Sequence, residues 1–320
     1  MEAHGVEAWV GVGAESTWGT GVSRTVFTEF LSESLDLKQG REAKPSLRGV
    51  SKARFVKKKK SVEGGLELQV QANGHEIFFK HILGAVATSG PVSSRYTHAF
   101  TLAKALPTGM SIEANRDSAA IGGSSSDLYV GCQVSKATFK QTAEDFLNLS
   151  LELLGKDGSF VAVSTPTFAS FLGFDWEGFT FSLDTGFGYA AIDISELEIS
   201  IDNGLAGDRY KLGQVARKGL GRGGHRTITG KLTKEFDSLT ERNLFRNLTQ
   251  GCKAKGEWTA QGDATSILTL EVLNLEWKGS DPKADTEGVL SLSMEFEARI
   301  ASTEGDEFTA TLVNETSSVP

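Results

Sequence analysis

A strand followed by a helix is predicted at residues 61–84. Apolar and polar side chains alternate in its first part, which is the period of a half-buried strand. The apolar positions of this strand are Val62, Leu66, Leu68 and Val70. Asn73 is expected to cap the helix, because Glu76 follows three residues later at the spacing of a capping box. The apolar face of the helix consists of Phe78, Phe79, Ile82 and Leu83, in pairs four residues apart.

The same pattern returns at residues 227–250, which align with 61–84 without a gap at an offset of 166 residues. Gly64 falls on Gly230 in this alignment. A repeat of this length indicates two copies of a domain rather than a solenoid. The chain is therefore expected to present one kind of surface twice.

Further alternating segments predict that the rest of each copy is mainly β. These segments are 31–37, 100–106, 110–117, 128–140 and 146–154 in the first half, and 194–202, 267–278 and 289–300 in the second. The predicted fold is two tandem β-sandwich or small-barrel domains, each with one flanking α-helix and a long loop between its first two strands. Residues 305–320 are expected to form a polar, extended tail.

With 320 residues the chain is long enough for two domains. We predict a first domain over 1–160 with an N-terminal arm, a joint over 161–190, and a second domain over 191–320 with the C-terminal tail. The joint region is rich in Phe and also holds Trp176, which is too apolar for a free linker. It is expected to clamp the two domains together.

No catalytic, cofactor or metal site is predicted. His75 and His81 are six residues apart on the predicted helix, a poor spacing for a shared metal, so surface or capping roles are expected. A GxGxxG match at 219–224 follows a basic loop instead of a strand, so it does not indicate nucleotide binding. Cys132 and Cys252 are expected to be reduced thiols. No signal peptide and no membrane-spanning segment are predicted.

The charge of the chain is divided unevenly. Residues 38–60 carry ten Lys/Arg and one Glu, and residues 204–226 carry six Lys/Arg and one Asp, whereas the whole chain has a net charge of −8. Three interpretations of these basic arms stay open: solvated loops, nucleic-acid binding, and contact with the acidic body of another subunit. Few aromatic residues accompany the arms, which weighs against nucleic-acid binding.

Four short motifs, together with the order strand, long loop, strand, helix in both halves, resemble a known family. The motifs are Gly13-Ala-Glu15-Ser-Thr-Trp-Gly19-Thr20, Ser32-Glu-Ser-Leu-Asp36, Ser46-Leu-Arg-Gly49 and Val62-Glu-Gly64. The chain resembles the tail tube (major tail) proteins of long-tailed phages, in the subgroup with two tandem tube domains. The motifs lie in the first half, and the second half is similar by layout and helix spacing.

The resemblance implies a non-enzymatic virion protein that assembles in the host cytoplasm. Its rings, expected to be homotrimers with pseudo-sixfold symmetry, would stack into the tail tube. The channel would hold the tape measure protein and then pass DNA, and the tube would meet tail terminator and tail tip proteins. The residues expected to line the channel are Ser32, Ser34, Asp36, Glu196, Glu198 and Ser200. The residues expected at the inter-ring contact are Arg48, Phe55, Lys57, Lys58, Lys59, Lys60, Arg217, Lys218 and Arg222.

Two other classes of protein remain. One is a tail terminator or another ring-forming tail component with the same domain. The other is a carbohydrate-binding β-sandwich pair, which would need exposed aromatic platforms.

Both basic arms are expected to be mobile in the free subunit, because neither has an apolar period.

Overall fold

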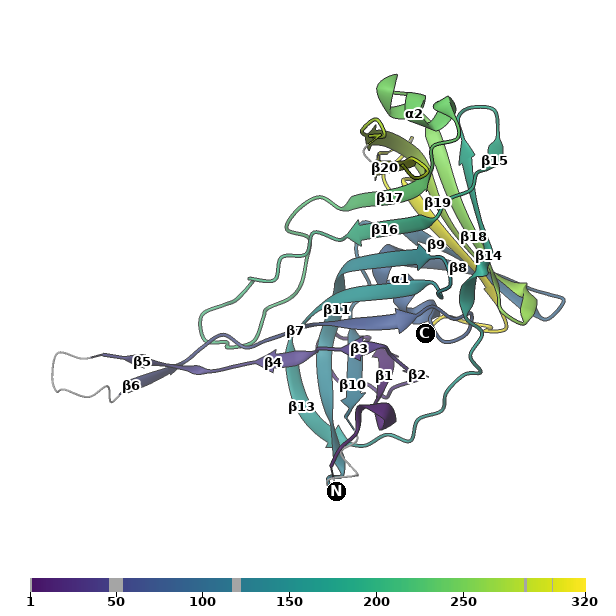
Figure 1. Cartoon of the computed structure of the whole chain (residues 1–320). Helices are drawn as coiled ribbons and strands as arrows, with labels where there is room; N and C mark the ends of the chain where they lie inside the picture. The colour runs from purple at the N-terminus through teal and green to yellow at the C-terminus, as the bar shows by residue number, and fades with distance from the viewer. Residues whose placement is uncertain (1, 46–53, 117–121, 285–286, 301) are drawn as a thin grey trace.

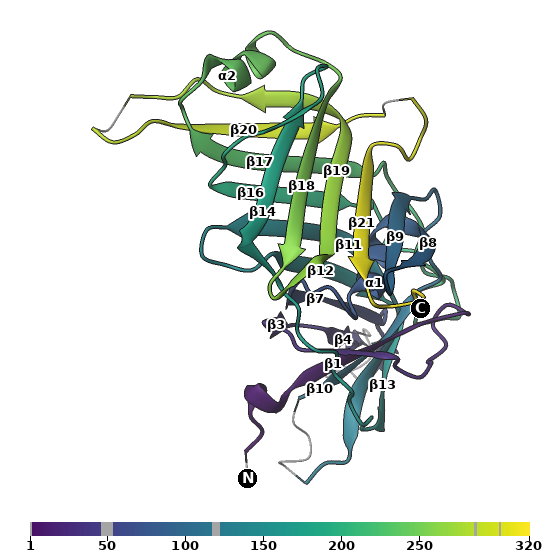
Figure 2. The same ribbon diagram turned by 90° about the vertical axis from the view of Figure 1, so that its right-hand side faces the viewer.

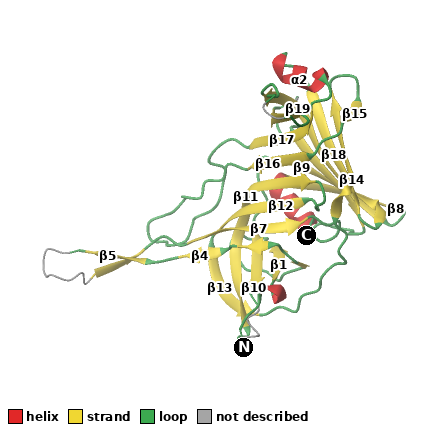
Figure 3. Cartoon of the chain, viewed as in Figure 1, coloured by secondary structure: helices red, strands yellow, loops and turns green. Residues whose placement is uncertain are grey.

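A computed structural model of the chain describes residues 2–45, 54–116, 122–284, 287–300 and 302–320. Within these residues the protein is mainly antiparallel β-sheet with two short α-helices (Figure 3). A short 3-10 turn, η1 (Gly5–Glu7), precedes the first strand. The predicted mainly-β fold is confirmed.

One long antiparallel sheet runs through both copies of the repeat. Its strands, in spatial order, are β3 (Ser32–Glu33) with β4 (Asp36–Lys38), β7 (Ser61–Gln69), β12 (Asn148–Gly155), β11 (Ser125–Thr142), β16 (Glu196–Asp202), β17 (Thr227–Glu235), β20 (Ser291–Ala298) and β19 (Asp263–Gly279). The copies meet between β11 and β16, which pair continuously from Lys136↔Asp202 to Thr142↔Glu196. Each copy therefore contributes four strands to the same sheet.

A second sheet in each copy packs across the long sheet. The first consists of β2 (Val26–Thr28), β1 (Trp9–Ala14), β10 (Met110–Asn115), the start of β11, and β13 (Asp157–Ala162). The other consists of β15 (Tyr189–Ala191), β14 (Phe174–Asp184), β18 (Cys252–Ala260), the start of β19, and β21 (Phe308–Asn314). Its strands run across those of the long sheet (Figure 2). The pairing order is the same in both copies, as expected for a duplicated domain.

A hairpin of β8 (Gly84–Val92) and β9 (Arg95–Leu102) breaks this symmetry. It follows the first helix, whereas the second helix leads directly into β18. β9 pairs along its free edge with β21, the last strand of the chain. The second sheet of the second copy is thereby extended by two strands from the first copy.

The two predicted helices are α1 (Glu76–Leu83) and α2 (Leu239–Arg246). The Asn73 cap is wrong: α1 begins after His75 and has no side-chain cap, because Gly74 has a φ of 90° and the helical backbone cannot start directly after Asn73. In α2, Ser238 accepts a hydrogen bond from the Thr240 N–H at 3.0 Å. The surface role expected for His75 and His81 is also wrong, since both are buried and burial lowers the pKa of each to about 3.

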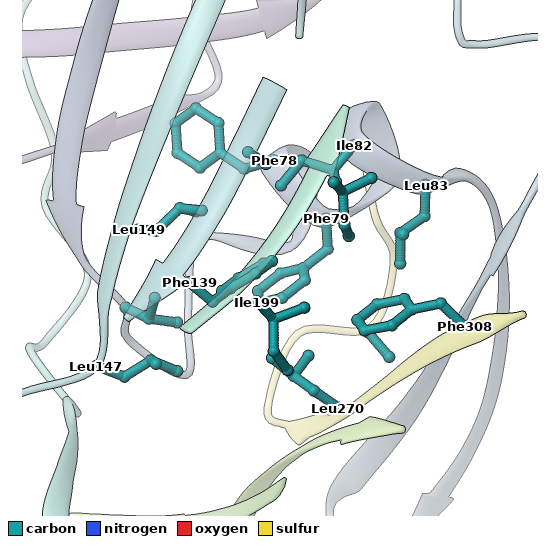
Figure 4. Close-up of a cluster of buried hydrophobic side chains, with 14 of the residues drawn as sticks. Phe78, Phe79, Ile82, Leu83, Phe139, Leu147, Leu149, Ile199, Leu270 and Phe308 are labelled. Carbon is teal, nitrogen blue, oxygen red and sulfur yellow. The ribbon is translucent and has the colours of Figure 1, made fainter. Parts of the chain in front are cut away.

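A single apolar core extends across the two copies. Helix α1 contributes the buried side chains of Phe78, Phe79, Ile82 and Leu83 (Figure 4). Phe79 stacks on Phe139 of β11 with ring centroids 5.7 Å apart, and Ile199 and Phe308 from the second copy lie in the same cluster. Burial of each such side chain contributes roughly 1.5–3 kcal/mol. The copies are consequently joined by shared packing as well as by strand pairing.

The two glycines aligned by the repeat sit where no side chain fits. A Cβ at Gly64 would lie 2.3 Å from the Ser34 carbonyl oxygen. A Cβ at Gly230 would lie 2.1 Å from the ring of Phe296, which covers this position. Glycine is therefore needed at this position in both copies. In the first copy the backbone at Ser34 occupies the space of a side chain, and in the second copy the Phe296 ring occupies it.

The opening motif of the chain is organised by a buried carboxylate. Glu15 accepts hydrogen bonds from the Gly19 N–H at 2.6 Å, the Gly131 N–H at 2.8 Å and the Ser111 hydroxyl at 2.9 Å. Trp18 donates from its indole N–H to the Gly131 carbonyl at 3.1 Å. The motif therefore fixes the turn after β1 against β10 and β11.

The C-terminal segment is not the extended tail predicted for 305–320. Part of it forms β21 (Phe308–Asn314), in which Phe308, Ala310 and Leu312 are buried on the core side. The alternation was overlooked because Thr and Ala occupy much of the segment. Just beyond Leu312, the buried amide of Asn314 donates to the Ala72 carbonyl at 2.7 Å and to the Glu76 carboxylate. The end of the chain thus closes over the beginning of α1.

Candidate assembly surfaces

The predicted channel-lining residues share the polar face of the long sheet. In β16, Leu197, Ile199 and Ile201 are buried, while Glu196, Glu198 and Ser200 alternate with them and are partly exposed. The predicted alternation of β16 is thus confirmed. The Ser200 hydroxyl lies 3.0 Å from that of Thr138 on β11, so polar side chains meet across the seam between the copies.

The first strand pair follows the same alternation at the edge of the sheet. Ser32 donates to the Glu67 carboxylate at 2.8 Å, and Leu35 is buried. Glu33 points inward and forms an ion pair with Arg116 at 2.8 Å; burial raises the pKa of Glu33, and Arg116 opposes this effect. Arg116 also donates to the Leu35 carbonyl at 2.8 Å, which anchors the edge strand to the body.

Carboxylates outnumber lysines on this polar sheet face. By register, the acidic residues are Asp36, Glu63, Glu67, Glu152, Glu196, Glu198, Asp202, Glu276, Glu295 and Glu297, and the basic ones are Lys38, Lys136, Lys140, Lys231 and Lys278. Some are paired across strands, such as Lys278 with Glu297 at 2.8 Å. Exposed pairs of this kind contribute only about 0.2–1 kcal/mol each. The face is therefore a hydrated, net acidic surface that repels phosphate groups.

The first basic arm is a hairpin and not the loop predicted for 38–60. Its described strands are β5 (Arg41–Lys44) and β6 (Arg54–Lys57), and it projects away from the body (Figure 1). Phe55 is 64% exposed and Val56 is 52% exposed. The side chains of Lys57, Lys58 and Lys59 are also exposed. Arg48 lies outside the described residues.

The second basic arm packs back against the base of the first. The Lys60 N–H donates to the Val215 carbonyl at 2.8 Å, and Lys60 also forms an ion pair with Asp157. The Lys59 ammonium lies 4.5 Å from the centre of the Tyr210 ring. The second arm therefore braces the first arm and does not project as a hairpin of its own.

Arg217 is the central contact of this brace. Its side chain is 2% exposed, and its guanidinium donates to the carbonyls of Val62 at 3.2 Å and Gly155 at 2.9 Å. It also pairs with the Glu63 carboxylate at 2.6 Å. Arg217 is therefore not exposed for the predicted inter-ring contact, because its side chain is buried and binds residues of its own chain.

The other two arginine and lysine positions predicted in this arm differ from each other. Lys218 is exposed. Arg222 is half-buried and donates to the carbonyls of Asn203 at 2.8 Å and Lys104 at 3.1 Å. Burial lowers the pKa of Arg222, and burial beside Arg222 lowers the pKa of Arg226 to about 10. Both arginines remain charged at neutral pH and hold the arm to the body.

An aromatic surface at the other end of β7 was not predicted. It surrounds a small cavity of about 100 Å³, which we call the aromatic hollow. The cavity is lined by Phe27, Thr28, Glu29, Phe30, Leu31, Gln69, Gln71, Phe168, Ala169 and Phe171. Phe168, Ala169 and Phe171 belong to the Phe-rich joint. The high Phe content of this segment is the one sequence feature that indicates an aromatic surface here. Phe168 and Phe171 are 44% and 47% exposed, so the joint is only partly buried in the core; Leu31, on the facing segment, is 57% exposed.

Within the described residues, no group of three or more His, Cys, Asp or Glu side chains could hold a metal ion. None of the helices described is long and apolar enough to cross a membrane. Both cysteines are free and buried, as expected.

Comparison with known proteins gives one family. The family model described as phage tail tube protein matches residues 5–298, which is nearly the whole chain. No curated protein matches the sequence.

Proposed function

The chain belongs to the phage tail tube protein family, and on that premise we propose that three copies form a ring and that stacked rings form the tail tube through which DNA passes. The family is structural rather than catalytic, and a member is a component of the virion tail. The observation that carries the proposal is the continuous pairing of β11 with β16, which joins both copies edge to edge in one sheet.

Ring closure follows from the edges of the long sheet. β3 and β4 pair with β7 on one side, and among the described strands neither pairs with another on its other side. The end of β19, near Gly279, forms the opposite edge. Pairing these two edges between neighbouring chains would close the sheets into a barrel and remove the exposed edges. Three chains with two copies each would give six equivalent four-stranded units.

The polar sheet face is proposed to line the channel. Ser32, Ser34 and Asp36, together with the β16 positions on the same face, would meet the tape measure protein during assembly and DNA during ejection. A net acidic wall supports this role, because like charge keeps DNA from adhering.

The stacking contacts are assigned to the first arm. It carries exposed lysines and the exposed side chains of Phe55 and Val56, whereas Arg217 and Arg222 act within the chain. With three chains per ring, each ring joint would thus contain three projecting arms. We propose assembly in the host cytoplasm, with tail terminator and tail tip proteins at the two ends of the tube.

Electron microscopy of the purified protein, combined with native mass spectrometry, tests the proposal. The expected result is tubes with a central channel and a dissociated ring mass of three chains. Rings of six chains would contradict the stoichiometry. Single rings that never stack would favour a tail terminator, and well-dispersed monomers at high concentration would contradict self-assembly.

A further inference from the structure

Charge is separated between the two ends of the long sheet. The connections at the arm end, 38–60 and 203–226, are basic. At the opposite end, the turn between β11 and β12 contains Glu144 and Asp145, and Glu177 lies near the start of β14. Glu144 and Glu177 are exposed. The subunit therefore has a basic end and an acidic end along the direction of the strands of the long sheet.

The aromatic hollow lies at the acidic end. Its wall residue Phe171 packs edge-to-face on Phe146 with ring centroids 5.4 Å apart. Trp176, which is 50% exposed, donates from its backbone N–H to the Asp145 carbonyl at 3.1 Å. Glu29 lines the hollow from the other side. The hollow is therefore an exposed aromatic surface bordered by carboxylates.

The β5–β6 hairpin carries the complementary chemistry. Phe55 and Val56 are its exposed apolar side chains, and its cations include Arg41, Arg54 and Lys57. The hairpin leads into β7 at Ser61, and the hollow is lined by residues at the other end of the same strand. Hairpin and hollow consequently face opposite directions along one axis, as a head-to-tail contact requires.

We propose that the aromatic hollow of one copy receives the β5–β6 hairpin of a copy in the adjacent ring. This inference rests on the proposed tube and names the surface that accepts the arm. Phe55 and Val56 cover the exposed rings of Phe168 and Phe171, and the hairpin cations meet the surrounding carboxylates. Arginine and lysine over aromatic faces add to the attraction. Three such contacts per ring joint make the stack stable although each is small.

Cysteine cross-linking tests the contact. Phe55→Cys and Phe168→Cys are made as separate variants at exposed positions, where a substitution is expected to disturb the fold little. The native thiols do not interfere, because Cys132 and Cys252 are buried. The two variants are mixed, assembled and oxidised, and disulfide-linked dimers are measured on a non-reducing gel. Phe187→Cys, at a position 99% exposed, replaces Phe168→Cys in the matched control.

The expected result is a cross-linked dimer at least tenfold more abundant than in the control mixture, and only after assembly. Ala169→Cys, which also lines the hollow, is the second variant if Phe168→Cys fails to fold, and it is expected to behave in the same way. Tubes that form without this cross-link, or with as much of it in the control, would overturn the assignment and leave the proposed function intact. Absence of any polymer of the unsubstituted chain would overturn both.

Discussion

Replacing Arg217 with alanine tests whether the second arm braces the first. The substitution removes a buried guanidinium and leaves the carbonyls of Val62 and Gly155 without their donor. A buried acceptor left unpaired costs about 1–3 kcal/mol, so the two carbonyls predict a loss of roughly 2–6 kcal/mol in the free energy of unfolding. Loss of the ion pair with Glu63 adds little to this cost, because Glu63 is partly exposed and keeps its pair with Lys38 at 2.8 Å.

The assay is urea unfolding of unassembled subunits. Lys218→Ala is the matched control, since this neighbouring side chain is exposed, and it is expected to change the free energy of unfolding by less than about 0.5 kcal/mol. Amide hydrogen exchange gives a local measurement: the Lys60 N–H, bonded to the Val215 carbonyl, is expected to lose protection in Arg217→Ala. Equal stability of the two variants, with Lys60 still protected, would refute the brace.

Two further predictions concern stability. Gly230→Ala is expected to lower the free energy of unfolding by about 1–3 kcal/mol, because the new Cβ would lie 2.1 Å from the Phe296 ring. Gly224→Ala is the control, since a Cβ there meets nothing within 4 Å. Equal unfolding midpoints of the two variants in urea would contradict this prediction. Hydrogen bonds from Thr265 and Ser266 and the pair with Arg95 lower the pKa of Asp263 to about 2 from its ordinary 3.8. Its contribution is therefore complete above pH 4 and is lost as the pH falls through 2, so Asp263→Asn is expected to flatten acid unfolding measured by circular dichroism over that range.

The sequence predicts strands best where one face is polar. β7, β16 and β17 alternate cleanly because one face packs on the core and the other meets water. β14 was missed because apolar residues such as Phe179 and Phe181 are embedded in a Phe-rich segment whose period is obscured. The β5–β6 hairpin was missed because its composition is dominated by charge, with no buried face to impose a pattern.

The roles of individual side chains were predicted less well than the strands. Arg217 contacts residues about 60 and 155 positions away, and no local pattern indicates such a partner. The edge position of Leu31, which leaves it exposed beside the hollow, also depends on which strands lie next to it. Polar positions on β16 could be predicted because their orientation follows from alternation alone.

The pairing of β21 with β9 has a consequence for the order in which the protein folds during synthesis. β9 is synthesised well before its second neighbour, β21. Until Asn314 is in place, the carbonyl of Ala72 and the carboxylate of Glu76 lack the hydrogen bonds that its side-chain amide donates. The amino-terminal half therefore lacks one neighbouring strand and these hydrogen bonds until residues 308–314 are available. A pairing between segments so far apart in the sequence forms late in folding, because the loop between them must be closed before the contact is made.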